Sequence, residues 1–244
     1  MKELMLTNQA VARGAYEAGV RVLSAYPGTP STEIAESFVK YDGVYAEWAP
    51  NEKVALEVAA GASVAGARAM ACMKHVGVNV AADPLFTAAY TGVNGGLVIV
   101  VADDPGMHSS QNEQDSRFYA RSAHVMMLEP SDAQEAKDFT KLAFELSEKY
   151  DTPVFIRLTT RVAHSRSLVE LGERTDDKLR PYEKSVTKYT MMPASAILRH
   201  QVVEERDIEL ANMVNTLDIN RVERSRRGGK IGVGCSGIVY QYVK

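Results

Sequence analysis

A glutamate at the start of a helix of small residues is the side chain whose position best suits acid or base chemistry. The Pro-Asn pair before Glu52 predicts a helix that runs to about Ala67. From Ala59 to Ala67 every residue except Val64 is Ala, Gly or Ser, so another chain segment can approach this helix closely. A carboxylate in a first helical turn ordinarily stabilises the positive end of the helix dipole. General acid or base catalysis is the alternative, and the helix alone does not decide between them.

A glycine motif near the end of the sequence is typical of a nucleotide-binding loop. Gly232, Gly234 and Gly237 satisfy G-x-G-x-x-G between a predicted strand and a predicted helix. The sequence stops seven residues later, before any acidic residue that could bind a ribose. We therefore favour glycines that serve a tight turn, and we keep a dinucleotide-dependent oxidoreductase only as a formal alternative.

Other motifs for metals and nucleophiles are sparse. Cys72 and Cys235 lie far apart, so this chain alone predicts neither a zinc ribbon nor an iron–sulfur cluster. No two histidines lie three or four residues apart, and neither a P-loop nor a G-x-S-x-G motif occurs. A metal site built from His108, Glu113 and Asp115 is conceivable, but a polar loop is the simpler interpretation.

Length, composition and charge narrow the possible functions. The chain has 244 residues, 45% hydrophobic and 24% charged, which fits a globular protein with a large core and excludes wholesale disorder. The net charge of −3 does not suit binding to a nucleic-acid backbone. The longest clean apolar run, Leu97 to Ala102, is too short for a signal peptide or a membrane span. We therefore expect a cytoplasmic protein with neither a nucleic-acid nor a membrane partner.

The elements that must position these residues alternate between helix and strand over the first 160 residues. This alternation predicts an α/β fold, in which a parallel sheet is flanked by helices. Thr29 and Pro30 predict the N-cap and first residue of one helix, and Ser131 and Gln134 predict a capping box for another. The expected helices cover 8–19, 30–39, 52–67, 83–90 and a segment from 131, and the expected strands cover 22–26, 68–73, 97–102 and 153–158.

The remaining sequence divides into a polar segment and a short apolar end. Residues 166–229 are polar and weakly helical, which predicts a connecting arm. Residues 230–244 read as a strand, a glycine turn and the start of a helix. A lone strand, turn and helix cannot bury its own faces. We therefore expect the beginning of a second α/β domain, or a segment that docks on the first.

Four segments resemble the thiamine-diphosphate-dependent 2-oxoacid:ferredoxin oxidoreductases, and within them the alpha subunit of indolepyruvate ferredoxin oxidoreductase. They are YPGTPSTEIAE at 26–36, EWAPNEKVALEVAAGASVAGARAM at 47–70, MKHVGVNVAADPL at 73–85 and VVADDPGMHSSQNEQDSR at 100–117. The resemblance implies that residues 1–165 form a pyrimidine-binding domain, followed by the arm and a truncated second domain. It implies oxidative decarboxylation of an aryl-2-oxoacid to an acyl-coenzyme A, with electrons passing to ferredoxin.

The resemblance also assigns roles to the first two segments. Glu52 falls where the family has its cofactor glutamate, which hydrogen-bonds the N1′ atom of the aminopyrimidine ring and controls proton movement there. Thr29 matches the family threonine that lies beside the substrate, and an N-cap hydroxyl is an equally good and compatible role. Pro27 and Gly28 would shape the same loop beside the cofactor.

The third and fourth segments supply further candidates. His75, Gly77 and Asn79 fall in the turn that the family places near the thiazolium ring, and His75 is either a substrate or acid/base contact or a structural histidine. His108 belongs to the indolepyruvate-type pattern as a substrate-side or subunit-contact residue. Asp104 stands where relatives that act on pyruvate carry a substrate-pairing arginine, so larger aryl-2-oxoacids are favoured.

This sequence also lacks two parts of the family pattern, and their absence bears on the cofactors. Its one Asp-Gly pair, Asp42-Gly43, has no preceding glycine, and two cysteines cannot hold a cluster. We therefore expect magnesium and iron–sulfur clusters only in missing parts, with coenzyme A and ferredoxin acting through the full complex, a homo- or hetero-oligomer. The alternative is a non-catalytic assembly or regulatory subunit that retains the fold.

Overall fold

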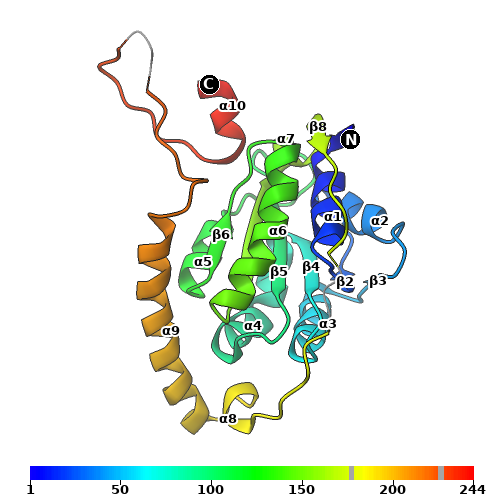
Figure 1. The fold of residues 1–244 in the computed structure, drawn as a ribbon, viewed down its shortest axis with the longest axis vertical. Helices are drawn as coiled ribbons and strands as arrows, with labels where there is room; N and C mark the ends of the chain where they lie inside the picture. Colours follow the sequence, from blue (N-terminus) through cyan, green and yellow to red (C-terminus); the bar gives the residue numbers. More distant parts are fainter. Residues whose placement is uncertain (176–178, 225–227) are drawn as a thin grey trace.

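The computed structural model describes residues 1–175, 179–224 and 228–244, so the expected arm at 166–229 lies partly outside the described residues. The described residues form a six-stranded parallel sheet in the order β3-β2-β4-β5-β7-β6 and a separate two-stranded sheet (Figure 1). The predicted parallel sheet flanked by helices is confirmed. Because the six strands run in the same direction, all their carboxyl ends lie along one edge.

The central strands are buried on both faces. Alternate residues of β4 face opposite helical layers, with Met70 and Cys72 on one side and Ala71 and Met73 on the other. This two-sided burial explains why the strands read as continuous apolar runs. The strands of the parallel sheet are β2 Val22–Ala25, β3 Tyr45–Trp48, β4 Ala69–Lys74, β5 Leu97–Asp103, β6 Met126–Leu128 and β7 Val154–Thr159.

Helices cover both faces of the sheet and make a three-layer fold. One layer contains α1 Thr7–Glu17, α2 Thr32–Phe38, α6 Ala133–Lys149 and α7 Thr160–Ala163. The other contains α3 Glu52–Val64, α4 His75–Thr91 and α5 Arg117–Ser122. The predicted start of α3 is confirmed, since the Asn51 side chain accepts a hydrogen bond from the Val54 backbone at 3.0 Å. It ends earlier than predicted because Gly66 adopts φ +98°, a left-handed conformation that closes the helix.

The capping of α6 differs from the prediction by one residue. Asp132, not Ser131, is the N-cap, and its carboxylate accepts the Glu135 backbone N–H at 2.9 Å. The Glu135 carboxylate accepts the Ser131 backbone N–H at 2.8 Å in return. Asp is as good a cap as Ser, so local spacing alone could not separate the two registers.

A small antiparallel sheet pairs the N-terminal strand with a strand that ends at residue 170. β1 (Lys2–Leu6) pairs with β8 (Arg166–Glu170), and the pair buries Met5 and Val169 against α1 and α6. The sequence analysis did not predict this pairing, because the two strands lie about 160 residues apart and local patterns carry no signal of such a partner.

A buried charge cluster fastens α1 to α6. Glu17 is fully buried and receives hydrogen bonds from Arg13 at 2.9 Å, Lys137 at 3.2 Å and Lys141 at 3.1 Å. The Gly172 backbone N–H adds a fourth at 2.6 Å. Burial alone would raise the pKa of Glu17, but these hydrogen bonds outweigh it and lower the pKa to about 2.

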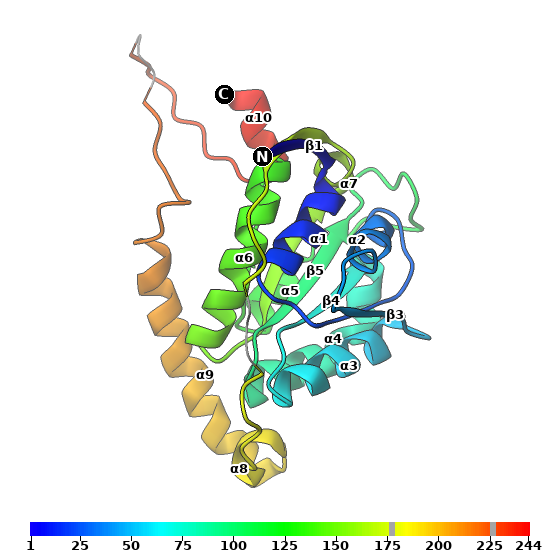
Figure 2. The same cartoon turned by 45° about the vertical axis from the view of Figure 1, so that its right-hand side comes forward.

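The arm carries two further helices, α8 (Val186–Tyr189) and α9 (Pro193–Val214), and α9 packs beside α4 (Figure 2). Buried Arg206 of α9 donates to the Asp151 carbonyl at 2.9 Å and to the Ala89 carbonyl at 2.8 Å. The Asp151 carboxylate also pairs with Lys188 and Arg199, at 2.8 and 3.2 Å. No helix in the described ranges is long and apolar enough to cross a membrane.

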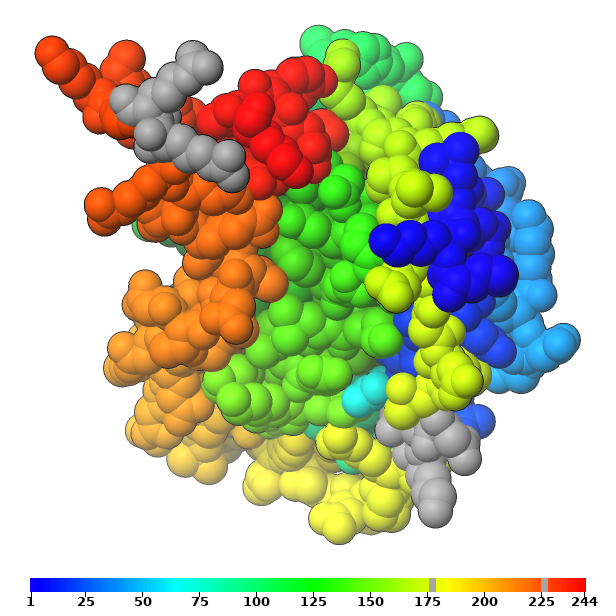
Figure 3. Space-filling model, turned by 45° about the horizontal axis from the view of Figure 1, so that its top comes forward, coloured from blue at the N-terminus to red at the C-terminus, as the bar shows by residue number. Residues whose placement is uncertain are grey.

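The terminal segment docks on the main body, beside the arm (Figure 3). The strand predicted near residue 230 is wrong: residues 231–236 form none, and only a 3-10 turn (Gly237–Val239) and α10 (Tyr240–Val243) follow. An isolated strand has no partner for its backbone groups. Gln241 donates to the Ser131 hydroxyl at 3.1 Å. The dinucleotide alternative therefore lacks the strand that its glycine loop requires.

Candidate functional site

The loops that follow β2, β3, β4 and β5 meet at the carboxyl edge of the sheet. The chain moves from β2 outward to β3 and then crosses to β4 on the other side of β2. Ligands of open α/β sheets bind at the carboxyl edge where the strand order reverses in this way. We call this position, between the ends of β2 and β4 and the loops around them, the crevice. Seven of the eight residues singled out from the sequence lie directly after these strands, at 27–29, 52 and 75–79. The eighth, His108, lies on the longer loop after β5.

Glu52 is the carboxylate of this crevice. It is the first residue of α3 and is only 8% exposed. Within the described residues its carboxylate accepts no hydrogen bond and forms no ion pair. Neither carboxylate oxygen is among the enclosed side-chain atoms that lack a hydrogen-bond partner, so both can be reached from outside the protein. A largely covered residue whose carboxylate stays accessible suits contact with a hydrogen-bond donor of a ligand.

Gly77 makes room for that carboxylate. A Cβ atom on Gly77 would lie 2.5 Å from Glu52 Oε1 and 2.6 Å from its Cγ, so only glycine fits beside Glu52 in this arrangement. Gly77 lies in the first turn of α4, because α4 begins at His75. The two predicted residues thus meet, although 25 positions separate them in the sequence.

The prediction of a turn at 74–79 and a helix only from Asp83 is wrong. Residues 75–91 form one helix that continues through Pro84. Val78, Ala81, Leu85 and Ala88 are buried on one face of it. Burial of this stripe outweighs the cost of a proline inside the helix, a balance that local signals miss.

His75 is held by the loop after β5. It is fully buried, and its Nε2 lies 2.9 Å from the Asn112 carbonyl oxygen. A carbonyl only accepts, so Nε2 carries a proton, and in that tautomer of imidazole Nδ1 is an acceptor. Nδ1 is buried without a partner in the described part of the chain. It is therefore the atom of His75 that could accept a hydrogen bond from a ligand.

Asn79 lies on the next turn of α4 and is exposed. Its side-chain oxygen accepts a hydrogen bond from the Tyr119 hydroxyl of α5. The structure therefore brings Asn79 to the same helix end as His75 and Gly77, but its oxygen already has a protein partner. Its amide group remains the part that could bind a ligand.

The loop after β2 does not start a helix at Thr29. The Ser31 backbone N–H donates to the Gly28 carbonyl at 2.8 Å, so residues 28–31 form a turn that contains a cis Thr29–Pro30 bond. α2 begins three residues later than Thr29, and the N-cap prediction for Thr29 is wrong. Pro27 and Thr29 are both exposed at the mouth of the crevice. Buried Asn8 donates to the Pro30 carbonyl at 2.8 Å and anchors this loop from α1.

Lys74 is the site residue that sequence reasoning missed. It is the last residue of β4, and its side chain crosses the β2 loop so closely that a Cβ on Gly28 would lie 2.9 Å from Lys74 Cδ. Its ammonium donates to the Ser109 carbonyl at 3.0 Å and to the Ser110 hydroxyl at 3.1 Å. The sequence did contain a signal for Lys74. It is a basic residue at the carboxyl end of a central strand, and parallel sheets place functional groups at that end.

The loop after β5 is organised by two buried carboxylates. Asp103 accepts from Arg157 at 2.7 Å and from the Ser116 backbone N–H at 3.1 Å. Burial would raise the pKa of Asp104, but hydrogen bonds from the Thr160 hydroxyl and the Ser109 backbone N–H lower it to about 2. Both carboxylates are saturated by protein donors, so they shape the loop and are not free for a ligand.

His108 is exposed on this loop, and its side chain forms no hydrogen bond or ion pair within the described ranges. The conceivable metal site with Glu113 and Asp115 is not formed, since Glu113 binds the Gly106 backbone and Asp115 pairs with Arg117 at 2.6 Å. Among residues 1–175, 179–224 and 228–244, no group of three His, Cys, Asp or Glu side chains is placed to hold a metal ion.

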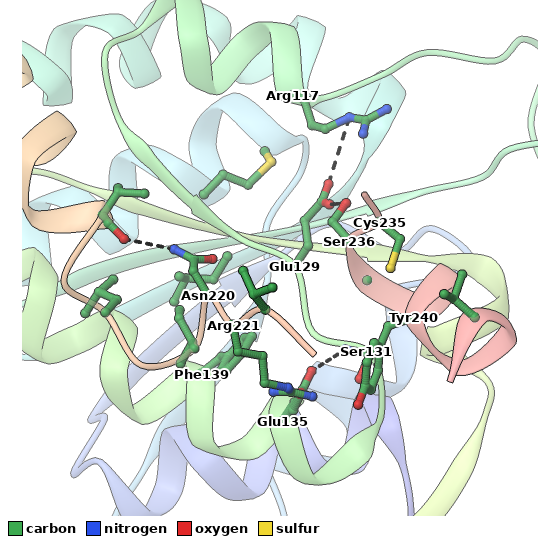
Figure 4. Close-up of a pocket in the computed structure, with 18 of the residues that line it drawn as sticks. Arg117, Glu129, Ser131, Glu135, Phe139, Asn220, Arg221, Cys235, Ser236 and Tyr240 are labelled. Atoms are coloured by element: carbon green, nitrogen blue, oxygen red, sulfur yellow. Dashed lines mark hydrogen bonds and ion pairs between the residues drawn. The ribbon is translucent and has the colours of Figure 1, made fainter. Parts of the chain in front are cut away.

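A cavity of about 1100 Å³ lies elsewhere, between the edge strand β6, the end of α9 and the terminal segment (Figure 4). None of the predicted site residues lines it. Glu129 lies at one end and binds the Ser236 hydroxyl and, at 3.9 Å, Arg117. Glu129 is therefore already paired, whereas in the described part of the chain neither the Glu52 carboxylate nor His75 Nδ1 has a partner. We place the candidate site in the crevice.

Comparison with known proteins identifies the family and the fold of this chain. The family model for pyruvate flavodoxin/ferredoxin oxidoreductase, thiamine diphosphate-binding, matches residues 13–218. Indolepyruvate oxidoreductase subunit IorA of Archaeoglobus fulgidus is 47% identical over 100% of this chain and 40% of the relative. The same subunit of Pyrococcus horikoshii is 47% identical over 100% of this chain and 39% of the relative. The chain thus spans about two fifths of the length of these curated relatives.

A more distant relative and a solved structure extend the likeness. The 2-oxoglutarate synthase subunit KorA of Methanocaldococcus jannaschii is 33% identical over 76% of this chain and 54% of the relative. A structure of 2-oxoglutarate:ferredoxin oxidoreductase from Magnetococcus marinus, with 2-oxoglutarate, coenzyme A and succinyl-CoA bound, matches with a TM-score of 0.70. It is 21% identical and covers 86% of this chain and 45% of that chain, so this likeness concerns the fold alone.

Proposed function

We infer, from the premise that this chain belongs to the thiamine diphosphate-binding family of pyruvate flavodoxin/ferredoxin oxidoreductases, that its crevice holds the aminopyrimidine half of thiamine diphosphate. The enzyme to which it contributes would oxidise indolepyruvate or a related aryl-2-oxoacid to an acyl-coenzyme A and pass electrons to ferredoxin. The names of the relatives at 47% identity support this substrate class. The observation that carries the proposal is the Glu52 carboxylate, which lies against Gly77 on a largely covered residue and has no partner among the described residues.

The residues present fit the aminopyrimidine group. That ring offers a nitrogen that needs a carboxyl partner and an amino group that needs acceptors. The crevice supplies both kinds of partner, in the Glu52 carboxylate and in the orphaned Nδ1 of His75. When bound, thiamine diphosphate supplies the carbon nucleophile for the keto group of the 2-oxoacid and accepts the electron pair released as CO2 leaves.

The roles of the chain's own groups follow from their surroundings. Glu52 exchanges a proton between its carboxylate and the bound ring nitrogen, and no protein donor among the described residues competes for that carboxylate. His75 accepts a hydrogen bond at Nδ1, and the Asn112 carbonyl fixes the tautomer that makes this possible. Thr29 lies at the exposed mouth and contacts substrate, with Pro27 and Gly28 shaping its loop.

The remaining parts of the reaction belong to other parts of the enzyme. We propose that magnesium and iron–sulfur clusters are held by other parts of the enzyme, since this chain spans about two fifths of the length of its curated relatives. The diphosphate end of the cofactor, coenzyme A and ferredoxin then meet this chain within an assembly of subunits. His108 and Asn79, both exposed at the mouth, are the candidates for substrate or subunit contacts there.

The test is Glu52→Gln in the assembled enzyme. Gln keeps the shape but cannot hold and release the proton, so reduction of a redox dye that depends on an aryl-2-oxoacid should be lost. Glu57→Gln is the matched control, since Glu57 lies on the same helix, is half exposed and only approaches Lys53 at 4.0 Å. Full activity of the Glu52 variant would overturn the assignment. An assembly that binds no thiamine diphosphate in calorimetry would instead favour the non-catalytic subunit.

A further inference from the structure

Lys74 occupies the centre of the crevice, at the point where the strand order reverses. Its backbone ends β4, directly before His75. Its aliphatic stem runs against Gly28, the neighbour of Thr29, and a Cβ on Gly28 would lie 3.2 Å from Lys74 Cγ. The stem is thus fixed by the β2 loop, and the charged end is directed toward the loop after β5.

The ammonium of Lys74 forms no ion pair with any carboxylate of the described residues. Its ammonium donates to two neutral acceptors, the Ser109 carbonyl at 3.0 Å and the Ser110 hydroxyl at 3.1 Å. No carboxylate lies within 4.0 Å of it in the described part of the chain. An ammonium has three donors, so one remains available. A half-buried cation with only neutral partners is a site prepared for an anion.

The acidic residues of the same loop do not compete for it. Asp103 is paired with Arg157 at 2.7 Å, and Asp104 is saturated by Thr160 at 2.6 Å and by backbone N–H groups. Asp104 contacts the same two serines as the lysine, because it accepts the Ser109 backbone N–H and the Ser110 hydroxyl. The loop therefore positions the ammonium through a carbonyl and a hydroxyl, and among the described residues no carboxylate pairs with it directly.

We propose that the Lys74 ammonium binds the carboxylate of the 2-oxoacid substrate, an inference that rests on the proposed function. Lys74 lies one residue from His75 and against the loop that carries Thr29. An ammonium is a point charge, whereas the arginine side chain binds a carboxylate through two parallel hydrogen bonds. Lys74 can therefore bind the substrate carboxylate without fixing the orientation of a bulky aryl group.

The test compares Lys74→Met with the wild type in the assembled enzyme. The readouts are the KM for an aryl-2-oxoacid, the KM for the corresponding aryl aldehyde, which lacks the carboxylate, and the affinity for thiamine diphosphate. Losing a charge-assisted hydrogen bond should raise the KM for the 2-oxoacid by about 10- to 100-fold. The aldehyde KM and the cofactor affinity should stay within about twofold of wild type.

Lys53→Met is the matched control, because Lys53 is 44% exposed on α3 and pairs with Asp83. It should leave every parameter unchanged. Lys74→Arg keeps the charge and should recover most of the lost affinity, whereas Lys74→Gln, a neutral residue that still hydrogen-bonds, should not. Thermal unfolding shows whether each variant folds. If Lys74→Met does not fold, Lys74→Gln serves as the neutral variant instead.

The two hypotheses fail in different ways. An unchanged 2-oxoacid KM in either neutral variant overturns the role of Lys74, and so does an equal rise for acid and aldehyde. A wild-type assembly that binds thiamine diphosphate but oxidises no aryl-2-oxoacid overturns the proposed function instead.

Discussion

Gly77→Ala tests whether the contact between α4 and Glu52 positions the candidate catalytic carboxylate. The new Cβ would lie 2.5 Å from Glu52 Oε1, well inside an ordinary carbon–oxygen contact. The carboxylate must therefore move by about 1 Å. The nearest atoms all belong to the flexible Glu52 side chain, so it can rotate away without moving either backbone.

The expected result is a loss of function without a loss of fold. A misplacement of about 1 Å at a reacting group can cost roughly 100-fold in rate. Alanine is the better helix former, so the free energy of unfolding should change by less than about 1 kcal/mol. Combined with Glu52→Gln, the substitution should add little further loss, because both act on the same group.

The assay is the steady-state rate with an aryl-2-oxoacid in the assembled enzyme, together with calorimetric binding of thiamine diphosphate and thermal unfolding. Gly61→Ala is the control, since Gly61 lies in α3, the helix of Glu52, and a Cβ there meets no atom within 4 Å. It should raise the thermal midpoint slightly and leave the rate unchanged. A folded Gly77→Ala enzyme with wild-type rate and cofactor affinity would refute the reasoning.

Three further predictions concern the scaffold. Asn8→Ala removes the buried donor to Pro30 and should lower the free energy of unfolding in urea by about 1–3 kcal/mol; a smaller change would mean the anchor is dispensable. Because the folded-state pKa of Glu17 is lowered from 4.5 to about 2, its stabilisation is complete above pH 4.5 and is lost on acidification toward pH 2. Between pH 4.5 and pH 2 the free energy of unfolding should fall by about 3 kcal/mol less in Glu17→Gln than in the wild type. If the two proteins lose the same free energy of unfolding over this pH range, the prediction is contradicted. Asp151→Asn removes the charge that pairs with two basic side chains of the arm, so hydrogen exchange at 193–214 should accelerate about tenfold while β4 and β5 stay protected.

The sequence predicted the central sheet well because its signals are local. The apolar run at 97–102 and the small-residue helix after Asn51 were both recognised from composition and capping alone. The sequence-based prediction failed where contacts between residues far apart in the sequence determine the structure. The helix through Pro84 forms because one face is buried, and the strand expected near residue 230 is absent because it has no partner.

The candidate site shows the same division. Glu52, Thr29 and His75 were chosen from the sequence, each near the end of a strand. The sequence could not show that Gly77 leaves the space that the Glu52 side chain occupies, or that Thr29 lies in a turn rather than at the start of a helix. Lys74 was missed because the contacts of its ammonium with Ser109 and Ser110, and the lack of a directly paired carboxylate among the described residues, depend on the folded loop after β5.

By itself the sequence determined the parallel α/β architecture and the residue types available at the carboxyl ends of its strands, since hydrophobic periodicity and capping act over a few residues. Only the tertiary structure decided which of those residues share a site. The loops that follow β2, β3, β4 and β5 start at positions tens of residues apart, and the reversal of strand order brings them to one crevice. The unpartnered state of Glu52 and of His75 Nδ1 depends on every neighbour at once, and no local pattern records it.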